Sequence, residues 1–67
     1  MRLDRVKLSA EMTRRDMTAK LMSSKSGVSR ATISGIKNGK SCSTTTANAI
    51  ARALGVPIEQ IMEEGDG

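Results

Sequence analysis

Apolar residues in this chain fall at helical spacing, in five short stretches separated by runs rich in Gly, Ser and Thr. The clearest pattern is an i, i+3, i+4, i+7 stripe, which predicts an amphipathic helix that ends at Gly55. Its apolar residues are Ala47, Ile50, Ala51 and Leu54. A polar connection over residues 41–45 precedes this helix. Strand patterns are nearly absent, so the chain is expected to be all-α.

Four more helices are expected from the same spacing. They cover about residues 4–15, about residues 19–26, the stretch between Ser29 and Asn38, and a fifth segment that starts at Pro57. Thr18 and Ser29 are good N-caps for the second and third helices, because a hydroxyl oxygen accepts from free N–H groups of the first turn. The residues expected to be buried are Leu3, Leu8, Met12, Met22, Ile33, Ile36, Ile58, Ile61 and Met62.

The length of 67 residues allows one domain at most. We expect a single compact five-helix domain over residues 1–67, with an ordered core of about residues 3–63 and a frayed Gly65–Gly67 end. Such a small core is usually reinforced by disulfides or a metal. With no histidine and only Cys42, an intramolecular disulfide and an ordinary zinc site are both excluded.

No catalytic constellation is visible, because histidine is absent and Cys42 has no neighbouring base in the sequence. We therefore expect no metal, no cofactor and no catalytic residues, and a protein that is not an enzyme. No apolar run approaches 18 residues, and the first residues lack the apolar stretch of a signal peptide. These features predict a cytoplasmic protein with no membrane partner.

Charge is distributed unevenly along the chain. Residues 1–40 hold ten basic and three acidic residues, a net charge of +7, whereas residues 41–67 hold one basic and four acidic residues, a net charge of −3. A basic body of this kind favours a polyanionic partner. Nucleic acid is favoured over a membrane surface, since no aromatic side chains are present to anchor a helix in lipid.

The most informative stretch runs from Met17 to Lys40. Two helices of about eight residues flank a turn at residues 26–29, in which Gly27 allows a left-handed backbone. A tight glycine turn lets two helices cross steeply and leaves one face of the second helix exposed. That geometry suits insertion of a helix into the major groove of DNA, although spacing alone fits an ordinary helical hairpin equally well.

The segments SGVSRATIS (residues 26–34) and IKNGK (residues 36–40) resemble the helix-turn-helix of the phage Cro and lambda-repressor family. Downstream, AIARALGV (residues 49–56) and IEQI (residues 58–61) resemble the fourth and fifth helices of that family. The resemblance covers about residues 5–62. It implies a five-helix domain that binds double-stranded operator DNA, usually as a two-fold homodimer on a palindromic site.

The resemblance also assigns candidate DNA-binding residues. By position, Ser29 matches a phosphate contact, Arg30 and Ala31 match the base-facing first turn, and Ser34 lies one turn further along. Thr18 matches the start of the second helix, where N–H groups can meet a phosphate. The loop that grips phosphate in the family is matched by Asn38 and Lys40. Lys37, with Met12, stands where the family commonly has a Glu–Arg pair, and its ammonium is expected to reach water or phosphate. The chain departs from the family at Ala19, where glutamine is common, and at Gly35, which has no side chain with which to read bases.

From these observations we expect a sequence-specific transcriptional regulator that blocks polymerase by occupying its operator, with no small-molecule effector. Dimerisation is expected through the fifth helix and the C-terminal tail. Two alternatives remain at the level of the sequence. One is the antitoxin of a toxin–antitoxin pair, and the other is a protein–protein adaptor on the same fold. An adaptor has no reason to gather so many basic residues in the first 40 positions.

Overall fold

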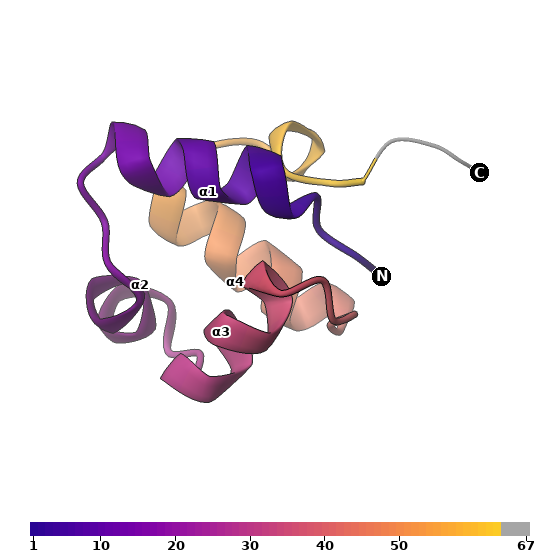
Figure 1. Cartoon of the computed structure of the whole chain (residues 1–67), viewed down its shortest axis with the longest axis horizontal. Coiled ribbons are helices and arrows are strands. Elements are labelled where there is room, and N and C mark those ends of the chain that lie inside the picture. The colour runs from indigo at the N-terminus through magenta and orange to yellow at the C-terminus, as the bar shows by residue number, and fades with distance from the viewer. Residues whose placement is uncertain (64–67) are drawn as a thin grey trace.

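The computed structural model describes residues 1–63 and is built from four α-helices and one 3₁₀ turn (Figure 1). Its elements are α1 (Arg5–Arg14), α2 (Ala19–Ser26), α3 (Arg30–Lys37), α4 (Thr44–Leu54) and the 3₁₀ turn η1 (Ile58–Gln60). Residues 1–63 form no strand, only one isolated bridge between Leu3 and Met62. The all-α expectation is confirmed. The frayed end expected at Gly65–Gly67 lies outside the described residues.

Each α-helix begins at a polar residue whose side chain accepts a hydrogen bond from a free N–H of the first turn. Asp4 caps α1, Thr18 caps α2, Ser29 caps α3 and Ser43 caps α4. Each such cap contributes about 1 kcal/mol of stability. Gly27 ends α2 with φ +77° and Gly55 ends α4 with φ +74°, a left-handed conformation that glycine adopts without a Cβ clash.

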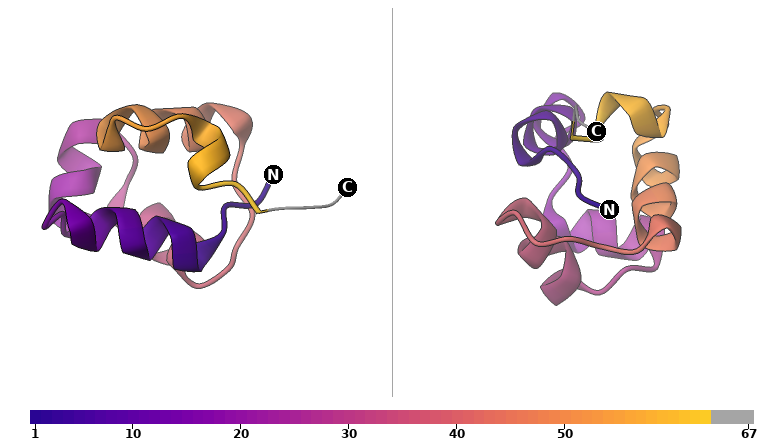
Figure 2. Two further views of the ribbon diagram at one scale, coloured as in Figure 1. Left: turned by 90° about the horizontal axis from the view of Figure 1, so that it is seen from above. Right: turned by 90° about the vertical axis from the view of Figure 1, so that its right-hand side faces the viewer.

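The core is aliphatic and draws on all four α-helices, together with Leu3 and Ile61. Helix α2 packs against both α3 and α4, α1 packs against α3, and η1 packs against α4 (Figure 2). The buried apolar residues are Leu3, Leu8, Met12, Met22, Ile33, Ile36, Ala47, Ile50, Ala51, Leu54 and Ile61. The stripe expected on the fourth helix is therefore buried in full. Within residues 1–63, no helix is long and apolar enough to cross a membrane.

The fifth helix expected from the sequence is not formed as predicted. After Pro57 the chain makes only one 3₁₀ turn, and Ile61 has already left helical geometry, with φ −124°. The Ile61 carbonyl accepts from Asp4 N–H at 2.8 Å, and Glu63 N–H donates to the Arg2 carbonyl at 3.2 Å. Pairing with residues 2–4 thus engages the main chain of Ile61 and Glu63, and the helical turn ends at Gln60.

Candidate nucleic-acid interface

The turn between α2 and α3 is fixed by its own side chains. Gly27 supplies the left-handed residue that reverses the chain. The Ser26 hydroxyl donates to the Met22 carbonyl at 2.7 Å and accepts from Val28 N–H at 3.1 Å. Val28 is half-buried against the core. These contacts set the crossing of the two helices, so the orientation of α3 is determined locally.

Helix α3 has one buried edge and one exposed face. Ile33 and Ile36 are fully or almost fully buried. Its opposite side carries small or polar residues, which we call the α3 face: Arg30, Ala31, Thr32, Ser34 and Gly35. All of these are exposed except Gly35, which is half-buried. The face is therefore free to approach a groove, with Arg30 as its only long side chain.

Three hydroxyls lie at the starts of the two helices. Thr18 Oγ1 accepts from Leu21 N–H at 3.1 Å. Ser29 Oγ accepts from Thr32 N–H at 3.1 Å and donates to Thr32 Oγ1 at 2.8 Å. Because the Ser29 proton is engaged within the turn, Thr32 carries the hydroxyl that is left to donate outward at the start of α3. Thr32 was not predicted from the sequence, because its role depends on the hydrogen bond that orients the Ser29 and Thr32 side chains.

A shallow hollow of about 320 Å³ lies along the α3 face, between the helix and the segment that follows it. Gly35 and Lys40 are among the residues that line it. A Cβ added at Gly35 would lie 3.2 Å from Lys40 Cδ, which is tighter than ordinary van der Waals contact. The missing side chain at Gly35 thus leaves room for the stem of Lys40 to lie across the helix.

The loop between α3 and α4 carries the remaining candidates. Asn38 is exposed and follows the last residue of α3, with its N–H bonded to the Ser34 and Gly35 carbonyls. Lys40 is exposed, and its N–H donates to the Gly35 carbonyl at 3.0 Å. Lys37 is half-buried and is the last residue of α3. The structure thus gathers seven of the eight candidates on α3 and its flanks, and Thr18 lies at the start of α2.

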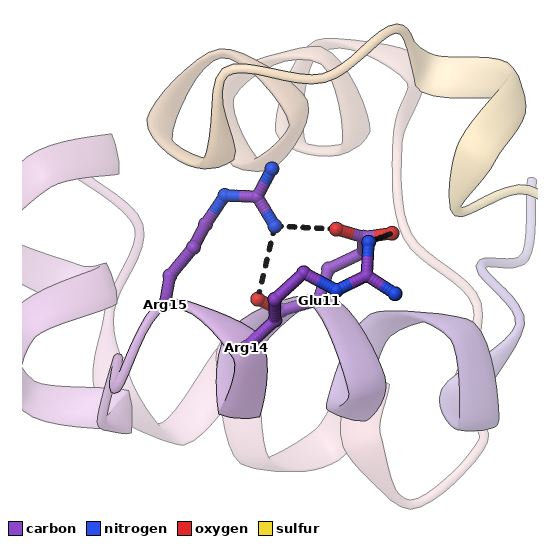
Figure 3. A network of polar contacts seen from close by, with 3 residues as sticks. All are labelled: Glu11, Arg14 and Arg15. Atoms are coloured by element: carbon purple, nitrogen blue, oxygen red, sulfur yellow. Dashed lines mark hydrogen bonds and ion pairs between the residues drawn. The ribbon is translucent and has the colours of Figure 1, made fainter.

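Not all of the basic residues are available to a ligand. Glu11 is buried in α1, and its carboxylate pairs with Arg15, which also donates to the Glu11 carbonyl at 3.2 Å (Figure 3). Arg14 lies 3.5 Å from the other carboxylate oxygen and is largely exposed. The charge of Arg15 is therefore compensated by the Glu11 carboxylate. Positive charge near the α3 face comes instead from Arg30, Lys37 and Lys40.

The described residues contain no cluster of three or more His, Cys, Asp or Glu side chains that could hold a metal ion. Cys42 follows the loop and is half-buried. Burial raises the pKa of the Cys42 thiol above its ordinary value, against a smaller lowering by the N-terminal amino group. The thiol is therefore protonated at neutral pH and is a weak nucleophile.

The sequence matches the model of the Cro/C1-type HTH DNA-binding domain over residues 7–64. This chain belongs to that family. The match includes α2, the glycine turn and α3, and the α3 face is exposed in the structure. The family resemblance expected from the sequence is confirmed. No curated protein matches the chain.

Solved structures with a similar fold include a dioxygenase. The chain is similar to a point mutant of hydroxyethylphosphonate dioxygenase, with a TM-score of 0.87, and to native PhpD with cadmium atoms, with a TM-score of 0.83. Both are 25% identical, and each match covers all of this chain but only 15% of the neighbour's chain. These matches contradict the expectation that the chain is not an enzyme, because the same Cro/C1-type fold forms part of a dioxygenase.

Proposed function

We propose that this Cro/C1-type domain is a sequence-specific DNA-binding regulator that inserts α3 into the major groove. The observation that carries the proposal is the exposed α3 face, held in position by a fixed glycine turn in a chain of this family. The small residues at Ala31, Ser34 and Gly35 allow the helix backbone to approach base edges closely. The groove, about 12 Å wide, accepts an α-helix.

The candidate residues divide into two roles. Arg30 has the geometry to bond guanine O6 and N7 together, and Ala31 can contact a thymine methyl. Thr18 and Thr32 offer hydroxyls, and Asn38 and Lys40 offer an amide and an ammonium, to the phosphates that flank the groove. Binding at a promoter would then regulate transcription by occluding polymerase.

The experiment is a selection of binding sites from random duplex DNA, followed by titration of the selected and a scrambled duplex at fixed salt. We expect the protein to bind the selected duplex about 10³-fold more tightly than the scrambled duplex, or tighter still, as specific sites generally do. Lys40→Ala should weaken binding to both duplexes. Arg52→Ala is the matched control, because it removes one exposed positive charge from α4, outside the interface.

Three outcomes of this experiment would contradict the proposal. Failure to retain any duplex would favour a protein–protein adaptor on the same fold. Equal affinity for selected and scrambled DNA would indicate binding without sequence readout. Equal losses in Lys40→Ala and Arg52→Ala would show that the interface is not at α3. An antitoxin would bind its own site and, in addition, form a stable complex with a toxin encoded beside it.

A further inference from the structure

The first four residues lie between two segments that are distant in sequence. On one side, Met1 and Cys42 exchange two main-chain hydrogen bonds, both of 2.8 Å. On the other side, the main chain of Arg2 and Asp4 pairs with Glu63 and Ile61. The N-terminus lies beside the α3–α4 loop in Figures 1 and 2. We call residues 1–4 the N-terminal segment.

Arg2 connects this segment to the centre of the α3–α4 loop. Its guanidinium donates to the Gly39 carbonyl through Nη2 at 2.9 Å and through Nε at 3.3 Å. Gly39 lies between Asn38 and Lys40, the two loop residues assigned to phosphate. It has φ +96°, in the left-handed region that favours glycine. Two donors on one oxygen fix the direction of that carbonyl.

The same peptide plane is held from its other end. The N–H of Lys40 donates to the Gly35 carbonyl at 3.0 Å, so both polar groups of the Gly39–Lys40 peptide have a partner. Without Arg2, the carbonyl side of this plane would be held by solvent alone. Rotation of the plane would change the direction in which the Lys40 side chain leaves the loop.

We propose that Arg2 is a positioning residue for DNA binding: it fixes the Gly39–Lys40 peptide and thereby directs Asn38 and Lys40 toward phosphate. This inference rests on the proposed function. The physical gain is pre-organisation, because a loop already held in its binding conformation loses less freedom when DNA is bound. The side chain of Leu3, which is almost fully buried, anchors the N-terminal segment from which Arg2 extends.

A simpler role for Arg2 would be to add positive charge near DNA, and Arg5 separates the two roles. Both arginines line one hollow of about 460 Å³ beside Asn38 and Gly39. Arg5 is exposed and carries the same charge, but it makes no hydrogen bond to Gly39. Lysine preserves charge at either position but lacks the planar guanidinium that places two donors on one oxygen. Arg2→Lys and Arg5→Lys are therefore a matched pair.

The experiment measures the affinity of the full chain and the two variants for the selected duplex at one salt concentration. We expect Arg2→Lys to weaken binding by about three- to tenfold, the size of one lost hydrogen bond. We expect Arg5→Lys to stay within about twofold of the parent. In the absence of DNA, hydrogen exchange at the Lys40 amide should accelerate in Arg2→Lys and stay unchanged in Arg5→Lys. Thermal unfolding of both variants verifies that they fold.

Two results would overturn the inference while leaving DNA binding intact. One is equal affinity of Arg2→Lys and the parent, and the other is an equal loss in Arg5→Lys. Either result would mean that Arg2 contributes only its positive charge and has no positioning role. If the parent chain binds no duplex at all, the proposed function fails first, and the Lys40 exchange data then report only on the loop.

Discussion

Arg30 is the only long side chain on the α3 face, and within residues 1–63 it makes no ion pair. Its guanidinium is thus free to read a base. We predict that Arg30→Ala relaxes base preference at one position in each half-site, with a loss of about 1–3 kcal/mol of discrimination. The measurement compares affinities for the selected duplex and for duplexes changed at single positions, all at one salt concentration.

The contrasting variant for Arg30 is Lys40→Ala. A phosphate contact carries no sequence information, so Lys40→Ala should weaken all duplexes alike and lower the salt slope by about one. If Arg30→Ala behaves in the same way, Arg30 binds phosphate and the base-reading role is wrong.

Gly35 provides a prediction in which stability and binding change in opposite directions. Alanine in place of a helix-interior glycine should raise the free energy of unfolding by about 0.5–1 kcal/mol. The added Cβ would meet Lys40 Cδ at 3.2 Å, and the flexible stem would have to move aside. We therefore expect Gly35→Ala to raise the melting temperature yet weaken DNA binding by about threefold.

A double-mutant cycle tests the cause of the Gly35 effect. In a Lys40→Ala background there is no stem to displace, so Gly35→Ala should still stabilise the fold but leave binding unchanged. An equal loss of binding in both backgrounds would mean that the new methyl group meets the DNA directly.

At the scale of elements, α1 contains an acidic residue that the fold buries. Glu11 lies beneath Arg15, whose side chain is about one-third exposed, whereas the side chain of Arg14 is 70% exposed. We predict that Arg15→Ala lowers the free energy of unfolding by about 1–2 kcal/mol, less than for a fully buried pair because solvent screens it. Arg14→Ala should cost less than about 0.5 kcal/mol.

Denaturant unfolding of the two arginine variants provides the measurement. Both variants remove an arginine side chain near the end of α1, Arg14 from its last residue and Arg15 from its C-cap, so the deleted side chain is the same in each. Similar losses of stability in both would show that burial of Glu11 does not distinguish its two partners.

The helices that the sequence predicted correctly are those with local boundary signals. The predicted 19–26 coincides with α2, and 4–15 exceeds α1 by one residue at each end, because caps such as Thr18 and glycines such as Gly27 act within one turn. The fifth helix failed because its length is decided by pairing with Leu3 and Asp4, almost 60 residues earlier. No pattern within residues 57–62 contains that information.

The candidate site divides in the same way. Ile33 and Ile36 fix the buried edge of α3, so helical periodicity alone identifies Arg30 and Ser34 as exposed. The contact of Lys40 with Gly35 and the bond from Arg2 to Gly39 arise only when the chain is folded. Residues that position other residues were therefore not visible in the sequence.

At the scale of the whole molecule, the domain measures 31 × 21 × 18 Å. Half-sites of helix-turn-helix dimers lie one turn of DNA apart, roughly 34–36 Å, so two copies of this size can stand side by side on one face of the duplex. Dimerisation was expected through the fifth helix and the tail. Ile61 is fully buried in its own core, which leaves the half-buried Ile58 and Met62 as the apolar side chains of that segment.

The charge of +7 on residues 1–40 leads to a prediction about the assembly on DNA. If each copy contacts about four to six phosphates, the affinity of a dimer for a palindromic duplex should fall by about 10³-fold or more between 50 and 200 mM salt, because released counterions set the slope. A duplex with a single half-site should show about half of that slope in a plot of log affinity against log salt concentration. Fluorescence titrations on the two duplexes provide both slopes. Equal slopes would show that one copy binds alone, and affinity that does not change with salt would contradict phosphate contact by the basic residues altogether.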